Sequence, residues 1–405
     1  MRGFRAIVWV SCVEAAPNSA RYRGTMPSLA PHALSVPGSG IRRIFEIALE
    51  LDDLIMLAVG EPDLPVAPHI LAAAAEAWAE DRTNYAPNGG IAPLRAAIVA
   101  KLARENGIEV DVEQVWVTVG ATQALHQALA LLLEPGDEVL VPDPGYTTFT
   151  MSTRLLSATP VPYLLRPEDD FAPDIAELDR LVTASTRVLV VNSPSNPLGR
   201  VFDESQLRAL LDFAKRHDLW VLSDEVYEFL TYGEKHVSIA SLDDENRVFT
   251  AFSLSKTYAM TGVRVGYLVV PPGLAPIMRT VQETTVSCVA MPDQFAAIAA
   301  ITGDQQHVSD ARQHYRANLE AACSLLDERG IRYLRPKGAM YLWLDVSYAS
   351  GEDVAGWAER FLLHERVAVA PGSAFGRSGE GWIRVCAAAT RADLLEGLRR
   401  LPSPN

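Results

Sequence analysis

The sequence QVWVTVGATQALHQALALLL, residues 114–133, joins an apolar run directly to a helical pattern. Residues 115–119 are predicted to form a strand that is buried on both faces of a sheet, because apolar residues dominate the run without regular alternation. Residues 121–133 have helical spacing, and Gly120 stands at the junction. A buried strand followed at once by a helix is typical of α/β proteins with a parallel sheet.

The same pattern recurs downstream. Helix DESQLRALLDFAKRHD (203–218) lies among strands expected at EVLVPDPGY (138–146), TRVLVVNSPSNP (186–197), LWVLSDEVYEFL (219–230), RVFTAFSLS (247–255) and VRVGYLVV (263–270). These alternating segments predict a mostly parallel central sheet with helices on both faces, in which ligands bind at the carboxyl ends of the strands. After about residue 295 the pattern becomes helical and then mixed, which predicts a second, smaller α+β domain.

Composition excludes several classes of partner. The chain has 405 residues, 49% of them apolar, and a net charge of −14 at pH 7, so its long-range field repels nucleic acids and anionic membranes. No run approaches the roughly 20 apolar residues of a membrane helix. Cys12, Cys288, Cys323 and Cys386 are far apart and lack zinc-site spacing, so we expect free thiols, no bound metal and a cytoplasmic location.

The first 40 residues are rich in Pro, Ser, Gly and Arg, and we interpret them as an N-terminal extension or arm. The opening MRGFR followed by AIVWVSCV imitates a signal peptide, but the apolar run is short and is soon interrupted by Glu14. A loose N-terminal extension is the interpretation we favour, and an upstream start codon, with Met26 as the alternative start, is one explanation for it.

Polar residues with chemical potential lie at predicted strand ends. Gly120, Ala121 and Thr122 open a helix directly after a strand, where free backbone N–H groups can bind a phosphate, although a plain turn has the same pattern. Asn196 lies in the turn NSPSNPLG, and Asp224 ends the run LWVLSD. On its own, Asp224 is equally consistent with a helix cap and with a functional carboxylate.

Lys256 and Arg264 lie in the largely apolar stretch FSLSKTYAMTGVRVGY (252–267). Interior lysines are rare unless they are paired or used in chemistry. A lysine, an aspartate, an asparagine and a tyrosine at neighbouring strand ends, with a phosphate-type helix start and a buried arginine, are together what pyridoxal 5′-phosphate (PLP) requires.

From Ile41 to Arg391 the chain resembles the fold-type I, class I/II aminotransferases. The resemblance is carried by LAVGEPDLP, NYAPNGGIAPLRAAI, VTVGATQAL, PGDEVLVPDPGY, NSPSNPLGR, SDEVYE, SLSKTYAMTGVRVGY and WIRVC, in that order. It implies transfer of an amino group from an L-amino acid to a 2-oxo acid by a ping-pong mechanism. It also implies a large PLP-binding domain over residues 60–295 and a small domain made of residues 41–59 and 296–405.

The resemblance also implies a role for each matching residue. Lys256 would bond the cofactor and move the substrate proton, and Asp224 would pair with the pyridine nitrogen. Asn196 and Tyr227 would contact the ring oxygen, and Tyr146 would stack on the ring. The phosphate would be held by Arg264, Ser253, Gly120, Ala121, Thr122 and the Tyr85 of a second subunit, which makes a homodimer. The substrate would meet Arg384, Gly60, Asn196 and Ile41. Ser255 would point away from the phosphate if its segment is extended.

Three questions stay open at this point. Thr122 stands where many prokaryotic aspartate-specific relatives carry a lysine, which puts strict dicarboxylate specificity in doubt and leaves aromatic, neutral or specialised donors. The same cofactor set also serves C–S lyases and other biosynthetic enzymes of this fold. A regulatory sensor domain of the same fold is a third alternative, but it would need a helix-turn-helix of about 60 residues before the match, where only some 40 are present.

Overall fold

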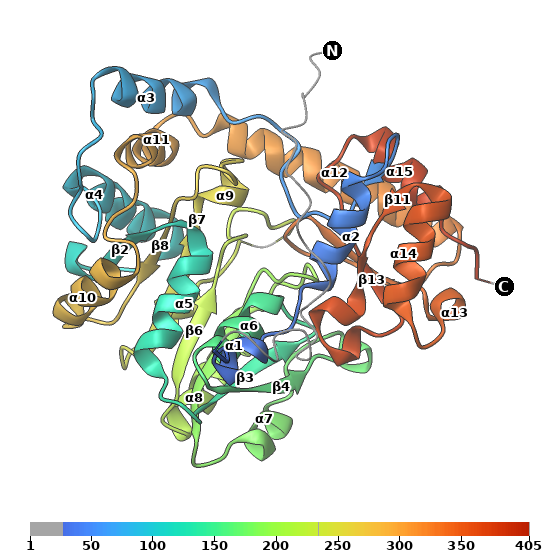
Figure 1. The fold of residues 1–405 in the computed structure, drawn as a ribbon, viewed down its shortest axis with the longest axis horizontal. Coiled ribbons are helices and arrows are strands. Elements are labelled where there is room, and N and C mark those ends of the chain that lie inside the picture. The colour runs from blue at the N-terminus through green and yellow to red at the C-terminus, as the bar shows by residue number, and fades with distance from the viewer. Residues whose placement is uncertain (1–26, 234, 405) are drawn as a thin grey trace.

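A seven-stranded sheet forms the centre of the protein (Figure 1). The computed structural model describes residues 27–233 and 235–404, so the prediction for Met26 and most of the N-terminal extension lies outside the described residues. The strand order is β2 (Val115–Thr118), β8 (Gly266–Val269), β7 (Val248–Ser253), β6 (Trp220–Asp224), β5 (Thr186–Asn192), β3 (Glu138–Asp143) and β4 (Thr159–Leu164). Only β8 in this sheet is antiparallel to its neighbours, which confirms the mostly parallel sheet.

Helices cover both faces of this sheet because successive residues of its strands point to opposite sides. Val188 and Val190 belong to a core with α5 (Gly120–Leu132), α6 (Thr147–Leu155) and α10 (Ala275–Thr285). Leu189 and Val191 point to the other side, toward α8 (Glu204–Arg216) and α7 (Ile175–Leu181). Next to them, a further core on β2, β7 and β8 is covered by α3 (Pro68–Ala79), α4 (Ala92–Lys101) and α11 (Met291–Thr302).

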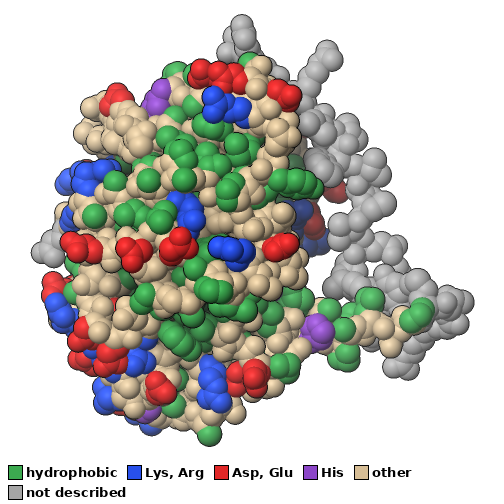
Figure 2. Space-filling view, turned by 90° about the vertical axis from the view of Figure 1, so that its left-hand side faces the viewer, with side chains coloured by type: hydrophobic (Ala, Val, Ile, Leu, Met, Phe, Trp, Pro, Cys, Tyr) green, Lys and Arg blue, Asp and Glu red, His purple; other side chains and the backbone are tan. Residues whose placement is uncertain are grey.

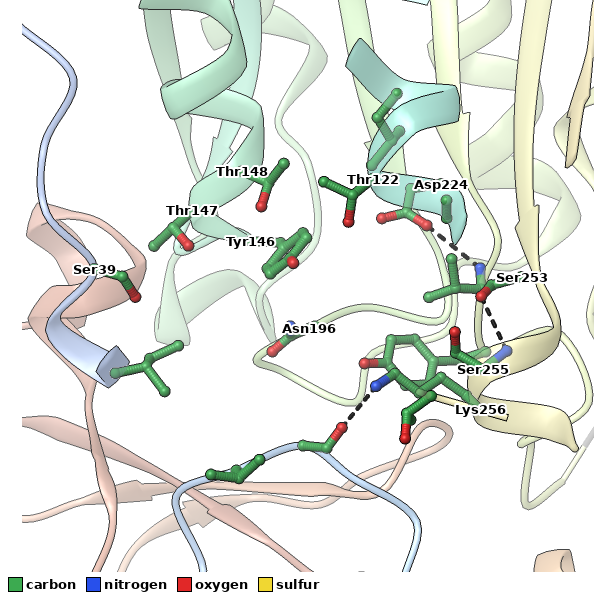
Figure 3. Close-up of a pocket in the computed structure, with 18 of the residues that line it drawn as sticks. Ser39, Thr122, Tyr146, Thr147, Thr148, Asn196, Asp224, Ser253, Ser255 and Lys256 are labelled. Atoms are coloured by element: carbon green, nitrogen blue, oxygen red, sulfur yellow. Dashed lines mark hydrogen bonds between the residues drawn. The ribbon is translucent and has the colours of Figure 1, made fainter. Parts of the chain in front are cut away.

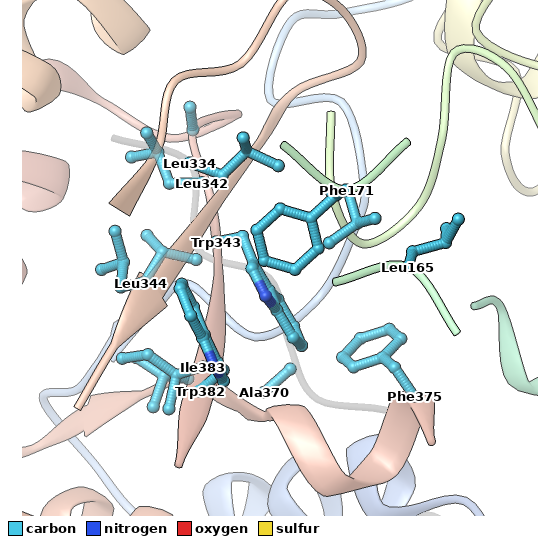
Figure 4. Close-up of a cluster of buried hydrophobic side chains, with 14 of the residues drawn as sticks. Leu165, Phe171, Leu334, Leu342, Trp343, Leu344, Ala370, Phe375, Trp382 and Ile383 are labelled. Carbon is cyan, nitrogen blue, oxygen red and sulfur yellow. The ribbon is translucent and has the colours of Figure 1, made fainter. Parts of the chain in front are cut away.

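A smaller antiparallel sheet lies beside the large one and contains β12 (Ala370–Pro371), β13 (Trp382–Cys386), β10 (Tyr341–Asp345) and β9 (Tyr333–Leu334). It packs with α12 (Gln306–Glu328), α14 (Val354–Glu365) and α15 (Arg391–Arg399). Trp343 and Trp382 stack at 5.9 Å between ring centres, and Phe375 meets Trp343 edge to face (Figure 4). The short helix α13 (Ser347–Ser350) follows β10.

The N-terminal segment connects the two sheets. The helix α1 (Pro31–Leu34) lies near α6, where Arg154 donates a hydrogen bond to the carbonyl of Ser35. The helix α2 (Gly40–Leu49) packs against α14, and β1 (Ile55–Met56) pairs in parallel with β11 (Val367–Ala368). None of the helices in the described ranges is long and apolar enough to span a membrane.

The predicted strand segments are longer than the strands of the structure, and three of these differences bear on the site. The segment predicted over 219–230 ends as a strand at Asp224, and the segment predicted over 263–270 begins only at Gly266. The segment predicted over 247–255 ends at Ser253, whose hydroxyl accepts a hydrogen bond from the amide of Ser255 and caps α9 (Leu254–Thr257). Lys256 therefore lies on a short helix, and the extended segment that would turn Ser255 away does not form.

The helix α14 offers two adjacent leucines in opposite environments. Leu362 is fully buried, whereas Leu363 is 48% exposed. Leu362→Ala should lower the free energy of unfolding by about 2–5 kcal/mol through lost burial and a residual cavity, and Leu363→Ala should change it by about 0.5 kcal/mol or less. Urea denaturation followed by circular dichroism measures both, and equal effects would contradict this packing of α14.

Candidate active site

A cavity of about 730 Å³ lies between the carboxyl edge of the large sheet and the smaller sheet (Figure 3). All of the residues predicted for the site line it except Gly120 and Tyr85: they are Ile41, Gly60, Ala121, Thr122, Tyr146, Asn196, Asp224, Tyr227, Ser253, Lys256, Arg264 and Arg384. The structure thus brings together side chains from widely separated parts of the chain, as the parallel sheet predicted.

Lys256 projects from α9 into this cavity, and its ammonium nitrogen donates a 2.7 Å hydrogen bond to the carbonyl of Gly60 (Figure 3). Burial lowers the pKa of Lys256 to about 8, with Arg384 and Arg264 lowering it further and Cys386 and Glu61 opposing them. Since no carboxylate in the described ranges forms an ion pair with Lys256, a sizeable fraction of its amine is neutral near physiological pH.

Asp224 ends β6 and is 3% exposed. Its carboxylate accepts a long, 3.4 Å hydrogen bond from the amide of Val226. Burial raises the pKa of Asp224 to about 7, Glu225 raises it further, and the Val226 amide and Lys256 lower it. A buried carboxyl group with so little support is suited to a cationic partner that enters the cavity, because such a partner would favour the charged form.

Arg264 lies against the first turn of α5. Its backbone has a φ of 60°, in the left-handed region that is uncommon for residues other than glycine. Gly120 explains the close approach, because a Cβ atom there would lie 2.4 Å from Nη2 of Arg264. Val119 gives this helix no side-chain cap, and Ala121 and Thr122 of its first turn line the cavity together with Arg264. This corner favours an anion. Arg264, which the sequence predicted to be buried, is exposed, because its guanidinium lies at the open side of the loop before β8 and donates to the carbonyl of Thr261 there.

Arg384, on β13, is 2% exposed and is the buried arginine of the site. It donates from Nη1 to Oδ1 of Asn196 at 2.9 Å and from Nη2 to the carbonyl of Ala58, while its buried Nε has no hydrogen-bond partner. No carboxylate forms an ion pair with it in the part of the chain that the structure describes. Its guanidinium lies over the ring of Tyr341, 4.4 Å from the ring centre, so the cation is held without charge neutralisation.

Two predicted residues have other surroundings. Gly120 does not line the cavity itself, but its Cα lies against the guanidinium of Arg264. Tyr85 is 91% exposed and lies away from the cavity of its own chain.

Sequence reasoning missed several residues that line or support the cavity. Ser255 lines it because α9 is helical, and Asn192 positions the loop that carries Asn196 by accepting a 2.9 Å hydrogen bond from its amide. Tyr341 lines the cavity, on the side that we call its floor, and its hydroxyl group is hydrogen-bonded to that of Tyr227. A phenol in the apolar run of YLWLDV (341–346) was the one available sequence signal for Tyr341.

Comparison with known proteins identifies the family. Residues 52–401 match the family described as aminotransferase class I and II. The chain belongs to this family. It is 38% identical to the aspartate aminotransferase of Pyrococcus abyssi, over 90% of this chain and 94% of that protein. It is 36% identical to aromatic-amino-acid aminotransferase 2 of Thermococcus litoralis, with the same coverage of both chains.

Solved structures agree with these relatives. The aspartate aminotransferase of Thermus thermophilus with maleate superimposes with a TM-score of 0.88 and 35% identity, over 93% of this chain and 99% of that chain. The protein is therefore an aminotransferase with the predicted α/β fold, and members of this family use PLP. Amino acids and 2-oxo acids are the substrates of such enzymes.

The cavity of the aminotransferase fits this cofactor on three observations. The uncapped start of α5 beside Arg264 suits a phosphate. The buried carboxyl of Asp224 lacks a strong counter-charge, as a partner for a protonated ring nitrogen requires. The amine of Lys256 is buried and easily deprotonated, as the capture of an aldehyde requires.

The lowered pKa of Lys256 predicts how cofactor capture depends on pH. Only the neutral amine attacks an aldehyde, and with a pKa of about 8 about a tenth of Lys256 is neutral at pH 7, about 300 times the fraction of an ordinary lysine. The rate at which the cofactor-free enzyme captures PLP should therefore rise about tenfold per pH unit below pH 8 and level off above it. Stopped-flow absorbance measures this rate, with N-acetyl-lysine amide as the control for titration of PLP itself. A rate that keeps rising to pH 10 would contradict the lowered pKa.

Proposed function

We propose that this enzyme transfers the amino group of an L-amino acid to a 2-oxo acid by a ping-pong mechanism, with Lys256 as the catalytic base. The observation that carries the proposal is that the amine of Lys256, with its lowered pKa, shares one cavity with two arginines, Arg264 beside the start of α5 and Arg384 on β13. Two separate guanidinium groups suit a cofactor that carries a phosphate and a substrate that carries a carboxylate.

When bound, PLP supplies an aldehyde for amino groups and an electron-withdrawing ring that makes the substrate Cα proton acidic. In our proposal Lys256 would hold the cofactor and, as a neutral base, would move the proton at the substrate Cα. Asp224, in its charged form, keeps the ring nitrogen protonated. Asn196 and Tyr227 donate hydrogen bonds to the ring oxygen, and Tyr146 stacks on the ring.

Phosphate binding is assigned to Arg264, Ser253 and the amides of Ala121 and Thr122, with Gly120 making room for the arginine. Backbone amides at a helix start and a guanidinium favour an anion through both charge and fixed donors. The structure adds Ser255 to the side chains at this end of the cavity.

Arg384 is assigned to the α-carboxylate of the substrate. Its guanidinium is oriented before any substrate arrives by Asn196 and by the carbonyl of Ala58, so little side-chain entropy remains to be lost on binding. Gly60 and Ile41 would contact the substrate from the other wall. A Cβ atom at position 60 would lie 2.1 Å from the hydroxyl oxygen of Tyr341, so this wall requires glycine.

The rest of the cavity supports a donor with a neutral side chain. Its further lining includes Ile41, Phe45 and Met151 with the hydroxyls of Ser39, Thr147 and Thr148, and Thr122 beside Arg264 is uncharged as well. Arg42 is the further cation that lines the cavity, and its largely exposed side chain lies 3.4 Å from Glu46. A distal carboxylate would have to compete with Glu46 for it.

An amino-donor panel tests the reaction and the substrate class together. The absorbance band of the lysine-bound cofactor should disappear on addition of a donor, and aromatic or aliphatic donors should react at least about 10-fold faster in kcat/KM than aspartate. Product formation should depend on an added 2-oxo acid.

The control variant is Lys256→Ala, which should lack both the band and turnover. Turnover at the wild-type rate in this variant would overturn the mechanism. Pyruvate and ammonia formed without an oxo acid would identify a C–S lyase, and a preference for aspartate would overturn the neutral-donor assignment.

We propose that residues 60–295 form a large domain and that residues 41–59 join residues 296–405 in a small one. The pairing of β1 with β11 and the packing of α2 on α14 support this division. A cytoplasmic location is also proposed. Free thiols at Cys288, Cys323 and Cys386 support it, and Cys12 lies outside the described residues.

A homodimer is the proposed active unit, in which Tyr85 reaches the phosphate site of the other subunit. The almost complete exposure of Tyr85 supports this, because its side chain is accessible to a second copy and lies away from the cavity of its own chain. Hydrophobic side chains spread over the face that carries α3, α4 and α10 (Figure 2), and exposed Leu71, Trp78 and Ile277 belong to these elements. A face of this kind is suited to a second copy.

Mixed dimers test this assignment. Tyr85→Ala and Lys256→Ala should each be impaired, but subunit exchange between them should restore activity, because one site of each mixed dimer then has Lys256 from one chain and Tyr85 from the other. Random exchange should give about a quarter of the wild-type activity, since half of the dimers are mixed and each has one intact site.

The matched control is a mixture of Lys256→Ala with Asp224→Asn, two residues placed in the same chain's site, which should not recover. Failure of the first mixture to recover, with exchange confirmed by mass spectrometry, would contradict the role of Tyr85 across the interface.

A further inference from the structure

Tyr341 is a buried phenol in the cavity floor that the proposed mechanism does not use. It lies on β10, is 1% exposed, and its hydroxyl oxygen is 2.7 Å from the hydroxyl oxygen of Tyr227. The two rings meet edge to face, with 5.6 Å between their centres. Tyr341 therefore touches the residue that the proposed function places beside the ring oxygen of the cofactor.

Each phenol has a single proton, so one member of the pair donates and the other accepts. The surroundings of Tyr341 decide which. Its hydroxyl oxygen lies against Gly60, close enough that a Cβ atom there would be 2.1 Å away, and a CH₂ group cannot accept a hydrogen bond. Tyr227 is the partner that the structure gives this hydroxyl within the described ranges. A proton directed away from Tyr227 would therefore be buried without an acceptor, which is costly.

The charges that face Tyr341 favour the same direction. Burial raises the pKa of both phenols, and the guanidinium of Arg384 opposes this at both. At Tyr341 Arg384 is the main opposing influence and the contact with Tyr227 also lowers the pKa, which is about 12 even though Cys386 and Tyr146 raise it. Burial and the contact with Tyr341 leave the pKa of Tyr227 well above its usual value. The more acidic phenol of a hydrogen-bonded pair is the better donor.

We propose that Tyr341 is a positioning residue that donates its proton to the Tyr227 oxygen and so leaves the Tyr227 proton free for the ligand in the cavity. This inference rests on the proposed function, in which Tyr227 donates to the ring oxygen of PLP. It adds a physical link between the two ends of the site, because Tyr341 also lies under Arg384. A hydrogen bond that Tyr227 accepts strengthens the one it donates.

The pH titration of the lysine-bound cofactor in the holoenzyme tests the direction of this pair. A hydrogen bond to the ring oxygen favours the form in which that oxygen carries more negative charge, which is the unprotonated linkage. Tyr227→Phe should therefore raise the titration midpoint by about 1–2 pH units. Tyr341→Phe should raise it by a few tenths of a unit, because it weakens the same bond without removing it.

Tyr232→Phe is the matched control. Tyr232 packs in the same buried cluster, and its hydroxyl donates to the carbonyl of Ala339 and not to Tyr227, so its removal should leave the midpoint unchanged. An unchanged midpoint in Tyr341→Phe would overturn the inference. So would a lowered one, because a lowered midpoint means that Tyr227 gives its proton to Tyr341 in the wild type.

These outcomes separate the inference from the proposed function. Wild-type protein without a titratable cofactor band, or a Tyr227→Phe variant with the wild-type midpoint, would overturn the proposed function and the inference together. A shift in Tyr227→Phe without one in Tyr341→Phe would overturn the inference alone.

Discussion

The site depends on the parallel hydrogen bonding of β5, β6 and β7. Their register aligns Asn192 with Asp224 and Asp224 with Ala251, two residues before Ser253. Because parallel strands end at the same edge, residues that follow each strand meet above that edge, whatever their separation in the chain. The acid, the amide loop and the lysine are therefore brought together by backbone pairing before any of their side chains interact.

The charged side chains that line the cavity are mainly positive, whereas the whole chain is negatively charged. The protein has a net charge of −14, yet Lys256, Arg264 and Arg384 line one cavity in which Asp224 is the buried acid. Each cation donates to a backbone carbonyl, those of Gly60, Thr261 and Ala58 respectively, which satisfies donors without neutralising charge. Burial of uncompensated charge is costly. The site therefore attracts small anions locally, although the distant field of the protein repels them.

Much of this arrangement could be predicted from the sequence, because short stretches of neighbouring residues determine the strands and the polar residues that follow them. Apolar runs determined the strands, and polar residues directly after them, Asn196 and Asp224, had to lie at the ligand-binding edge. The predictions that failed depend on tertiary contacts. Residues 254–255 and 263–265 were predicted as strand, but the Ser253 cap starts a helix and Arg264 adopts a left-handed backbone.

Tyr341 could not be found for a similar reason. Its strand belongs to the smaller sheet and is remote in sequence from every recognised motif, so only packing reveals that its hydroxyl lies beside Tyr227. Its alternation pattern is that of a core residue, and a core phenol needs no functional explanation. Asn192 was missed for the same reason. Its side chain is hydrogen-bonded to backbone groups of Asn196 and Asp224, a contact that only the folded structure reveals.

The short segment from Leu57 to Gly60 joins parts of the molecule that belong to different sheets. The amide of Leu57 pairs with Ala368, and its carbonyl accepts from the amide of Cys386, so this segment is attached to the strand of Arg384. The next carbonyl, that of Ala58, holds Arg384 itself, whereas the carbonyl of Gly60 accepts from Lys256 on the large sheet. If the sheets rotate relative to one another, Arg384 travels with the carbonyl of Ala58, and three hydrogen bonds lie across the boundary: Lys256 to Gly60, Arg384 to Asn196, and the one between Tyr341 and Tyr227. Such a rotation would therefore act on the amine, the guanidinium and the phenol pair together.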